Sequence, residues 1–266
     1  MGEEFVLRNG IEKILNFLKE SFLISIQTSK EYKLNTYFMI TFDFFLVASK
    51  LFAFYIILSI VGDLIGWNVY DYFMCFVLIL AYWKFWWMHN LRGFSRNLLR
   101  GDLNNYLTKP ISTYLQICSN NMSFANFVSG IFLLILIYII AIYQNYSNFL
   151  FATSVLILGQ IAFVFLRNLF EAFAFFTKNL NLFSTIYDEF DDIILKFTPK
   201  IFKETIFSSL AFIFNSVFAY FFIEILKGNF NEFNTYFPYL LTFSIIICIT
   251  FVFVWNIGLK KYEAFG

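Results

Sequence analysis

Long apolar stretches alternate with short polar segments along the whole sequence. A helix needs about 20 mostly apolar residues to cross the hydrocarbon core of a bilayer, and six stretches have roughly that length. They cover residues 37–61, 70–87, 124–143, 149–170, 205–226 and 236–255. The pattern predicts an all-α integral membrane protein in which a single domain, residues 1–266, carries six transmembrane helices.

The composition excludes a soluble globular domain. Hydrophobic residues make up 60% of the chain and charged residues only 14%, against about 25% charged residues in ordinary soluble domains. The mean hydropathy is +0.70, and 41 residues are phenylalanine. A soluble domain of this size could not bury so much apolar surface, so we expect the chain to lie in a lipid bilayer.

The basic residues are distributed very unevenly between the two sides of the predicted spans. Of the 19 Lys and Arg residues, Lys227 alone falls on one side, and Lys50 lies inside the first span. The others lie before the first span, after the last, or in the second-to-third and fourth-to-fifth connections, with which Lys84 and Arg167 at the ends of their spans are counted. Lys and Arg are enriched in cytoplasmic loops. The chain is therefore predicted to be a multi-pass protein of the plasma membrane with both termini in the cytoplasm.

The first 33 residues are predicted to form an amphipathic helix. Apolar residues recur there with the helical period, at Leu7, Ile11, Ile14, Leu15, Leu18 and Phe22. Such a helix can lie in the cytoplasmic interface of the membrane, or it can bind a soluble partner. The sequence leaves both interpretations open.

A polar segment between the second and third spans, NLLRGDLNNYLTKPISTYLQ at 97–116, stands out from its surroundings. Arg92, Arg96 and Arg100 have the spacing that places three side chains on one helix face. Gly101 is the expected residue after the helix end, and Asp102 is expected to cap a second, short helix.

Pro110 then restarts the chain before the third span. The predicted result is a capped pair of short helices at the cytoplasmic face. Two interpretations follow: an arginine face that binds lipid phosphates, or a rigid knob that a cytoplasmic protein can grip.

Two charges, Asp43 and Lys50, fall inside the first span. A charge at the bilayer centre costs about 2.5–3.5 kcal/mol on insertion scales. The two residues share a helix face but are separated by about 10 Å of rise, so each needs another partner or a position near the interface. The acidic run at 188–192 lacks the spacing of a calcium loop, and we interpret it as a solvated helix face.

Residues that commonly carry catalysis are sparse. The three cysteines are far apart and lie in or beside apolar runs, which favours buried small side chains over a disulfide or a metal site. His89 is the single histidine, and the phosphate-binding GxxxxGK[ST] loop is absent from the sequence. The chain is predicted not to be an enzyme and to bind no cofactor of its own. The five tryptophans fall at span ends, where indoles favour the headgroup level.

Three stretches carry a resemblance to a known family. They are RGDLNNYLTKPI at 100–111, FTPKIFKETIFSSLAFIFNSVFAYF at 197–221 and WNIGLKKYEAFG at 255–266. In their order and six-span frame they resemble the ABC-2 type permeases, the membrane subunits of ABC exporters. The resemblance implies two permease subunits, a second copy or a paralogue, around a pathway. It also implies separate ATPase subunits, which bind the ATP.

The resemblance also assigns roles within the chain. Residues 1–33 would be a connecting helix, and 91–109 would be the main coupling segment that contacts the ATPase. Its expected coupling residues are Arg96, Leu99, Arg100, Gly101, Asp102, Leu103, Lys109 and Pro110. Arg96 and Arg100 would pair with acidic groups of the ATPase, and Leu99 and Leu103 would fill an apolar groove on it.

The expected function is export of a hydrophobic or amphipathic substrate: a drug, a peptide or a lipid. The expected partners are the ATPase, the second permease subunit and the bilayer, with no nucleic acid. The alternative is a membrane scaffold or assembly protein that transports nothing. An ion-coupled transporter would need an internal repeat, which the sequence does not reveal.

Overall fold

The protein is mainly helical in the part of the chain that its structure, a computed structural model, describes. The described residues are 2–61, 67–88, 90–91, 93–177, 185 and 215–265, and no strand occurs among them. The elements are α1 (Gly2–Glu31), α2 (Lys33–Val61), α3 (Val69–Met88), α4 (Phe94–Leu99), α5 (Asn104–Leu107), α6 (Thr113–Asn120), α7 (Phe124–Tyr143), α8 (Phe149–Ala172), η1 (Phe173–Phe175), α11 (Asn215–Leu226) and α12 (Phe230–Phe265).

The long helices fall where the apolar stretches predict them. Among the described residues, four helical segments are long and apolar enough to cross a membrane: Val69–Met88, Phe124–Tyr143, Phe149–Phe175 and Phe237–Tyr262. These helices establish an integral membrane protein. α2 covers the first predicted span, whereas the first half of the fifth, 205–214, lies outside the described residues. The total of six spans therefore stays a prediction.

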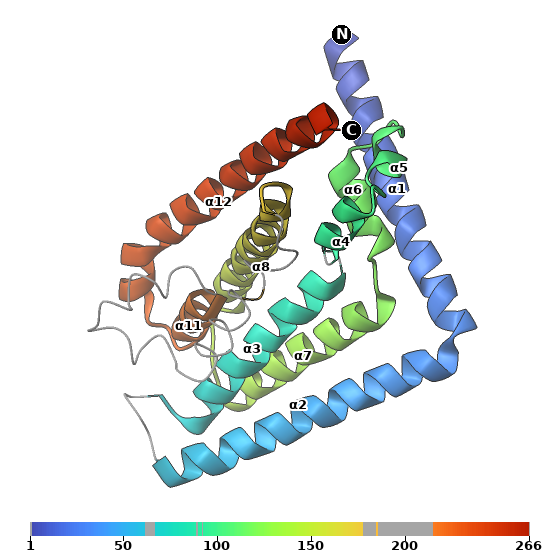
Figure 1. Cartoon of the computed structure of the whole chain (residues 1–266). Coiled ribbons are helices and arrows are strands. Elements are labelled where there is room, and N and C mark those ends of the chain that lie inside the picture. The colour runs from blue at the N-terminus through green and yellow to red at the C-terminus, as the bar shows by residue number, and fades with distance from the viewer. Residues whose placement is uncertain are drawn as a thin grey trace.

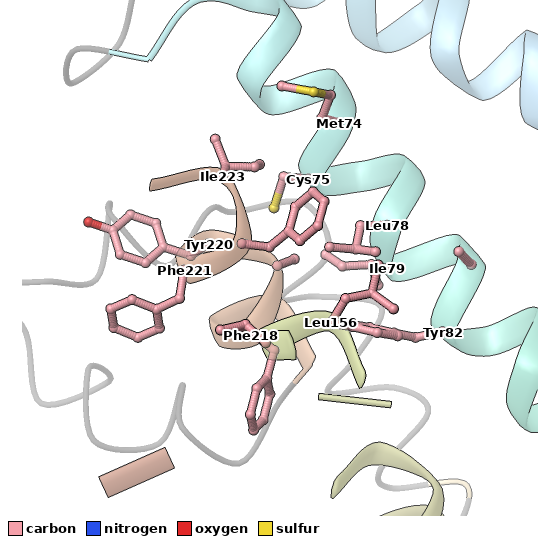
Figure 2. Close-up of a cluster of buried hydrophobic side chains, with 14 of the residues drawn as sticks. Met74, Cys75, Leu78, Ile79, Tyr82, Leu156, Phe218, Tyr220, Phe221 and Ile223 are labelled. Atoms are coloured by element: carbon pink, nitrogen blue, oxygen red, sulfur yellow. The ribbon is translucent and has the colours of Figure 1, made fainter. Parts of the chain in front are cut away.

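The centre of the molecule is a bundle of α3, α7, α8, α11 and α12 (Figure 1). α3 packs against α7 and α11, and α8 packs against α11 and α12. In Figure 2, Cys75 from α3 lies beside Ile223 from α11, and Met74, Leu78 and Phe218 belong to the same buried cluster. These side chains belong to the main buried cluster, so the bundle is held together by apolar packing.

α1 and α2 lie outside this bundle. α1 ends near the start of α2, and the two form an open angle along one edge of the molecule (Figure 1). α1 is attached where α7 begins: the Phe124 N–H donates to the Ser25 hydroxyl at 2.8 Å, and Phe22 packs edge-on against Phe127. Leu15 of the predicted apolar face remains exposed, so membrane and partner binding both stay open for α1.

Two cations that the sequence places in loops lie buried inside helices. Lys84 is in α3 and Arg167 in α8, and their exposed fractions are 8% and 3%. The Arg167 guanidinium lies 4.9 Å from the Trp83 ring centre and 4.6 Å from that of Trp86. A cation over an indole face is stabilised by the ring quadrupole, which helps to explain how Arg167 is buried. Neither residue is therefore a loop charge.

For three of the tryptophans, the indole ring is enclosed by the protein instead of facing the lipid headgroups, while the predicted depth in the membrane stays a prediction. Trp67, Trp86 and Trp255 are buried within the chain. The indole N–H of Trp67 donates to Glu224 at 2.6 Å, and that of Trp86 donates to Asn168 at 3.2 Å. These rings meet their hydrogen-bond requirement inside the protein, so they pack helices together.

Gly159 permits the close crossing of α8 with α3 and α11. A Cβ at this position would lie 2.5 Å from the Tyr82 hydroxyl oxygen and 2.7 Å from the Phe218 Cβ. The Phe218 Cβ is fixed to its backbone and cannot move aside without shifting α11.

Gly159→Ala is therefore expected to destabilise the fold by about 1–3 kcal/mol, the usual cost of overpacking. Thermal melting of the detergent-solubilised protein, followed by size-exclusion chromatography, measures the loss. Gly130→Ala is the matched control, because the atoms nearest a Cβ there are the outer ring carbons of Phe85, which can yield. Equal melting temperatures for both variants and the wild type would contradict this account of the crossing.

Candidate functional site: the segment between α3 and α7

The segment begins with a glycine in the left-handed conformation, which the sequence analysis missed. Gly93 has φ +77° and stands at the N-cap of α4, so α4 starts only at Phe94. The predicted helix that would place Arg92, Arg96 and Arg100 on one face is therefore wrong in extent. α4 has 6 residues, Arg100 is its C-cap, and Arg92 lies outside the described residues.

The predicted end of α4 at Gly101 is confirmed. Gly101 has φ +75°, the left-handed conformation that glycine adopts without strain. The Gly101 N–H donates to the Leu98 carbonyl at 3.2 Å, and the Asp102 N–H donates to the Asn97 carbonyl at 3.0 Å. This pair of bonds is a Schellman motif, which satisfies the last carbonyls of a helix.

Asp102 does not cap α5 as predicted. The N-cap of α5 is Leu103, and it makes no side-chain capping bond. Asp102 contributes its backbone N–H to the turn. Serines cap the next two helices: Ser112 accepts from the Leu115 N–H in α6, and Ser123 accepts from the Asn126 N–H in α7. Both caps follow the ordinary preference for serine at this position, a signal available in the sequence.

The inner side of the segment is buried in a second apolar cluster. Leu91, Phe94, Leu103 and Ile117 pack there against α8, η1 and α12. The Phe94 ring centre lies 4.9 Å from that of Phe175. Leu103 is fully buried, so the expectation that it fills a groove on a partner is wrong. Its side chain helps to fix the segment onto the bundle.

Asn168 of α8 joins three parts of the structure through its side-chain amide. Its oxygen accepts from the Trp86 indole at 3.2 Å and from the Leu91 N–H at 3.3 Å, and its nitrogen donates to the Tyr114 hydroxyl at 2.9 Å. Asn168 is completely buried. A buried amide with several partners fixes relative position, so the segment, α3, α6 and α8 are expected to move together.

The outer side of the segment is basic and partly apolar. Arg96, Leu99 and Arg100 are exposed at the end of α4, and Lys109 and Pro110 are exposed after α5. Leu99, a large apolar side chain, is 59% exposed. Five of the eight predicted coupling residues are thus available for contact with a partner, while Gly101 and Asp102 form the turn that presents them.

The cysteine of this segment is structural. Cys118 in α6 is fully buried and forms no disulfide. Burial raises the pKa of its thiol to about 12, because a thiolate would be poorly solvated there. The prediction of a buried small side chain is confirmed, and a nucleophilic role for Cys118 is disfavoured.

The intramembrane charges stay untested. Asp43 and Lys50 lie on the backbone of α2, but their side chains are outside the described part of the structure. The acidic run at 188–192 and His89 are also outside the described residues. Within the described residues, no group of three or more His, Cys, Asp or Glu side chains could hold a metal ion.

A polar cluster at the opposite end of α3 escaped the sequence analysis. The Lys227 ammonium lies 2.7 Å from Asp71, which is completely buried. Asp71 also accepts from the Tyr146 hydroxyl at 2.6 Å and from the Asn68 N–H at 3.0 Å. The Asp71 N–H donates back to the Asn68 side chain at 2.9 Å, a reciprocal capping arrangement at the start of α3.

The cluster continues to Glu224 in α11. Besides the Trp67 indole, the Asn229 side chain donates to Glu224 at 2.6 Å. Together the two carboxylates tie the start of α3 to the α7–α8 and α11–α12 connections. Lys227, which the charge count left alone on its side, thus has a structural partner from a distant part of the chain.

The comparisons with known proteins agree with this architecture. The sequence profile described as "ABC-2 family transporter protein" matches residues 44–266, most of the chain, including the segment between α3 and α7. No curated protein and no solved structure matches the chain.

Proposed function

Because the chain belongs to the ABC-2 family of transporter proteins, we propose that it is the permease subunit of an ABC exporter driven by a separate ATPase subunit. Two copies, or one copy and a paralogue, would enclose the transport pathway. Export direction and substrate class are parts of this proposal, as is the assignment of both termini to the cytoplasm.

The observation that carries the proposal is the two-sided build of the segment between α3 and α7. One side, with Phe94 and Leu103, is locked into the bundle, and the other presents Arg96, Leu99 and Arg100. An element that transmits the movement of an ATPase must be rigid toward the membrane helices and accessible toward the partner. The hydrogen bonds of Asn168, which hold the segment on α3 and α8, support the required rigidity toward the membrane helices.

The proposed substrates are hydrophobic or amphipathic. The helices expose many Phe, Tyr and Ile side chains, among them Phe38, Phe45 and Phe52 on α2. Pathway walls of this composition bind ligands through apolar area and aromatic faces, with few directional hydrogen bonds. Sugars and inorganic ions would find few polar partners on such walls.

Cysteine labelling tests the proposed orientation. In a background with the three native cysteines replaced by alanine, single cysteines at Ser147 and Asn231 are expected to react with an impermeant maleimide in intact cells. Cysteines at Asn104 and Lys260 are expected to react only after the cells are opened. All four positions are exposed. Labelling of Asn104→Cys in intact cells would overturn the orientation.

Co-purification tests the function. The chain is expected to co-purify with the ABC ATPase encoded nearest to its gene. ATP hydrolysis by the complex in nanodiscs is expected to rise several-fold with some hydrophobic or amphipathic compounds and not with sugars. A stable complex whose hydrolysis responds to no compound would favour a scaffold. Stimulation by sugars alone would contradict the proposed substrate class.

A further inference from the structure

The short helix α5 carries an exposed turn of the candidate coupling segment but has little of its own to hold it in place. The helix has four residues, none of them buried, and no side chain caps its start. A helix of about one turn is not stable by itself in water. Thr108, Lys109 and Pro110, which follow it, are all exposed. The position of this turn therefore depends on contacts from another element.

Gln116 of α6, which lies beside α5, supplies those contacts (Figure 1). Its side-chain amide nitrogen donates to the Tyr106 carbonyl at 3.1 Å and also to the Ile111 carbonyl. These two carbonyls stand at the two ends of the exposed turn. Pro110 within the turn has no N–H, so the turn has fewer backbone donors with which to close on itself. Gln116 is only 3% exposed, and water hardly competes for its amide.

α6 is in turn fixed to the membrane helices. Ile117 is buried in the second apolar cluster. The Tyr114 hydroxyl accepts from Asn168 of α8 at 2.9 Å. The Tyr114 ring centre also lies 5.1 Å from that of Phe251 in α12. Gln116 thus connects the exposed turn to a helix that is itself packed on α8 and α12.

Asn120 of α6 makes a second contact with α5, through the side chain of Tyr106. Its amide nitrogen donates to the Tyr106 hydroxyl at 2.9 Å. Asn120 is exposed, so water can replace this hydrogen bond at little cost. The buried bonds of Gln116 to the backbone and the exposed bond of Asn120 to a side chain therefore form a matched pair for experiment.

We propose that Gln116 is a positioning residue for coupling: its amide holds the exposed turn after α5 at a fixed place on α6, so that movement of the ATPase reaches α8 and α12. The inference rests on the proposed function, because it requires an ATPase at this turn. Gln116 lies outside the expected coupling segment and is buried, so it acts through the turn and not by touching the partner. Asn168 fixes the beginning of the segment at Leu91, and Gln116 fixes its end.

Spin labelling of the full-length chain in nanodiscs tests the clamp without an ATPase. A nitroxide is attached to Lys109→Cys in the cysteine-free background. Gln116→Met removes both donors with little change in volume, so the mobility of this label is expected to rise several-fold. A label on Arg100→Cys, at the end of α4, is the control and is expected to keep its mobility. Unchanged mobility of the label at position 109 overturns the proposal.

ATP hydrolysis by the permease–ATPase complex tests the role in coupling. The probe is whichever of verapamil, gramicidin and lysophosphatidylcholine stimulates the wild type most. Gln116→Met is expected to lower the ratio of stimulated to basal hydrolysis several-fold, whereas the probe concentration for half-maximal stimulation stays unchanged. A loss of stability alone would lower both rates together and leave the ratio as it is. Asn120→Ala, the matched control on the same helix, is expected to keep the wild-type ratio.

A second variant and the wild type make each outcome decisive. Gln116→Glu has the same shape, but a carboxylate has no donor for the two carbonyls. It is expected to lose coupling as Gln116→Met does, and it supplies the result should Gln116→Met fail to fold. A wild-type ratio in either variant, in a complex that the probe stimulates, overturns the proposal. A wild-type complex that none of the three probes stimulates contradicts the proposed function instead, and the positioning role falls with it whatever the label shows.

Discussion

Gly101→Val is expected to reduce stimulation of ATP hydrolysis in the permease–ATPase complex by roughly tenfold, while the transmembrane helices remain folded. Gly101 has φ +75°, and a Cβ there meets no atom within 4 Å. The cost is therefore backbone strain, about 1–2 kcal/mol for an ordinary residue in the left-handed region. Because another backbone conformation would relieve that strain, most molecules would lose the turn that presents the segment to the ATPase.

The controls for this prediction use the same turn. Asparagine accepts the left-handed conformation more readily than valine, so Gly101→Asn is expected to retain most of the stimulation. Asp102→Ala is expected to have little effect, because Asp102 contributes its backbone N–H to the Schellman motif. For all three variants, pull-down of the ATPase and the rate of ATP hydrolysis are measured, and the melting temperature serves as a check on folding. Wild-type coupling in Gly101→Val would exclude this turn from the coupling element.

Charge reversal distinguishes a protein partner from a lipid partner. Arg100→Glu is expected to weaken ATPase pull-down, since Arg100 is exposed beside Leu99. If the segment instead binds lipid phosphates, Arg100→Glu lowers association with anionic vesicles, and Gly101→Val has no effect on either measurement. A protein partner therefore predicts that both variants are impaired, whereas lipid binding predicts that Arg100→Glu alone is.

Lys227→Met is expected to destabilise the protein by about 3–5 kcal/mol, the usual cost of removing one partner from a buried ion pair. Asp71 is completely buried and lies 2.7 Å from the Lys227 ammonium. Without the lysine, the fully buried carboxylate keeps its hydrogen bonds from Tyr146 and Asn68 but loses its ion-pair partner. The melting temperature of the solubilised protein is expected to fall by roughly 10 °C.

The double variant identifies the cause. Asp71→Asn combined with Lys227→Met removes both charges, so much of the lost stability is expected to return. Lys227→Arg keeps the charge and is expected to stay near wild type. If the double variant is as unstable as the sum of the two single variants, the Asp71–Lys227 pair is not what stabilises this end of the bundle.

Some features of the protein follow from local sequence patterns. The positions of α3, α7 and α8 follow from runs of apolar residues, since a helix in lipid satisfies its own backbone hydrogen bonds. The turn at Gly101 follows from one glycine at the end of a short helical pattern. The resemblance to the permease family rests on stretches that include this turn, and the family match confirms it.

Other features depend on contacts between residues far apart in the chain. Leu103 and Leu99 look alike in sequence, yet Leu103 is buried and Leu99 is exposed. Their difference depends on how the segment packs on α8, η1 and α12. Lys84 and Arg167 were assigned to loops because charges are normally solvated, but the Trp87, Trp83 and Trp86 rings beside them accommodate their burial.

The membrane class, the positions of α3, α7 and α8, and the turn that shapes the candidate coupling segment thus follow from the order of the amino acids alone. These depend on interactions within three or four residues and on the solvent that each stretch prefers. The tertiary structure alone decided which polar residues face inward, as in the pairing of Asp71 with Lys227 and the anchoring of the segment by Asn168. Such pairs are separated by many residues, and only the packing of helices brings their side chains within hydrogen-bond distance.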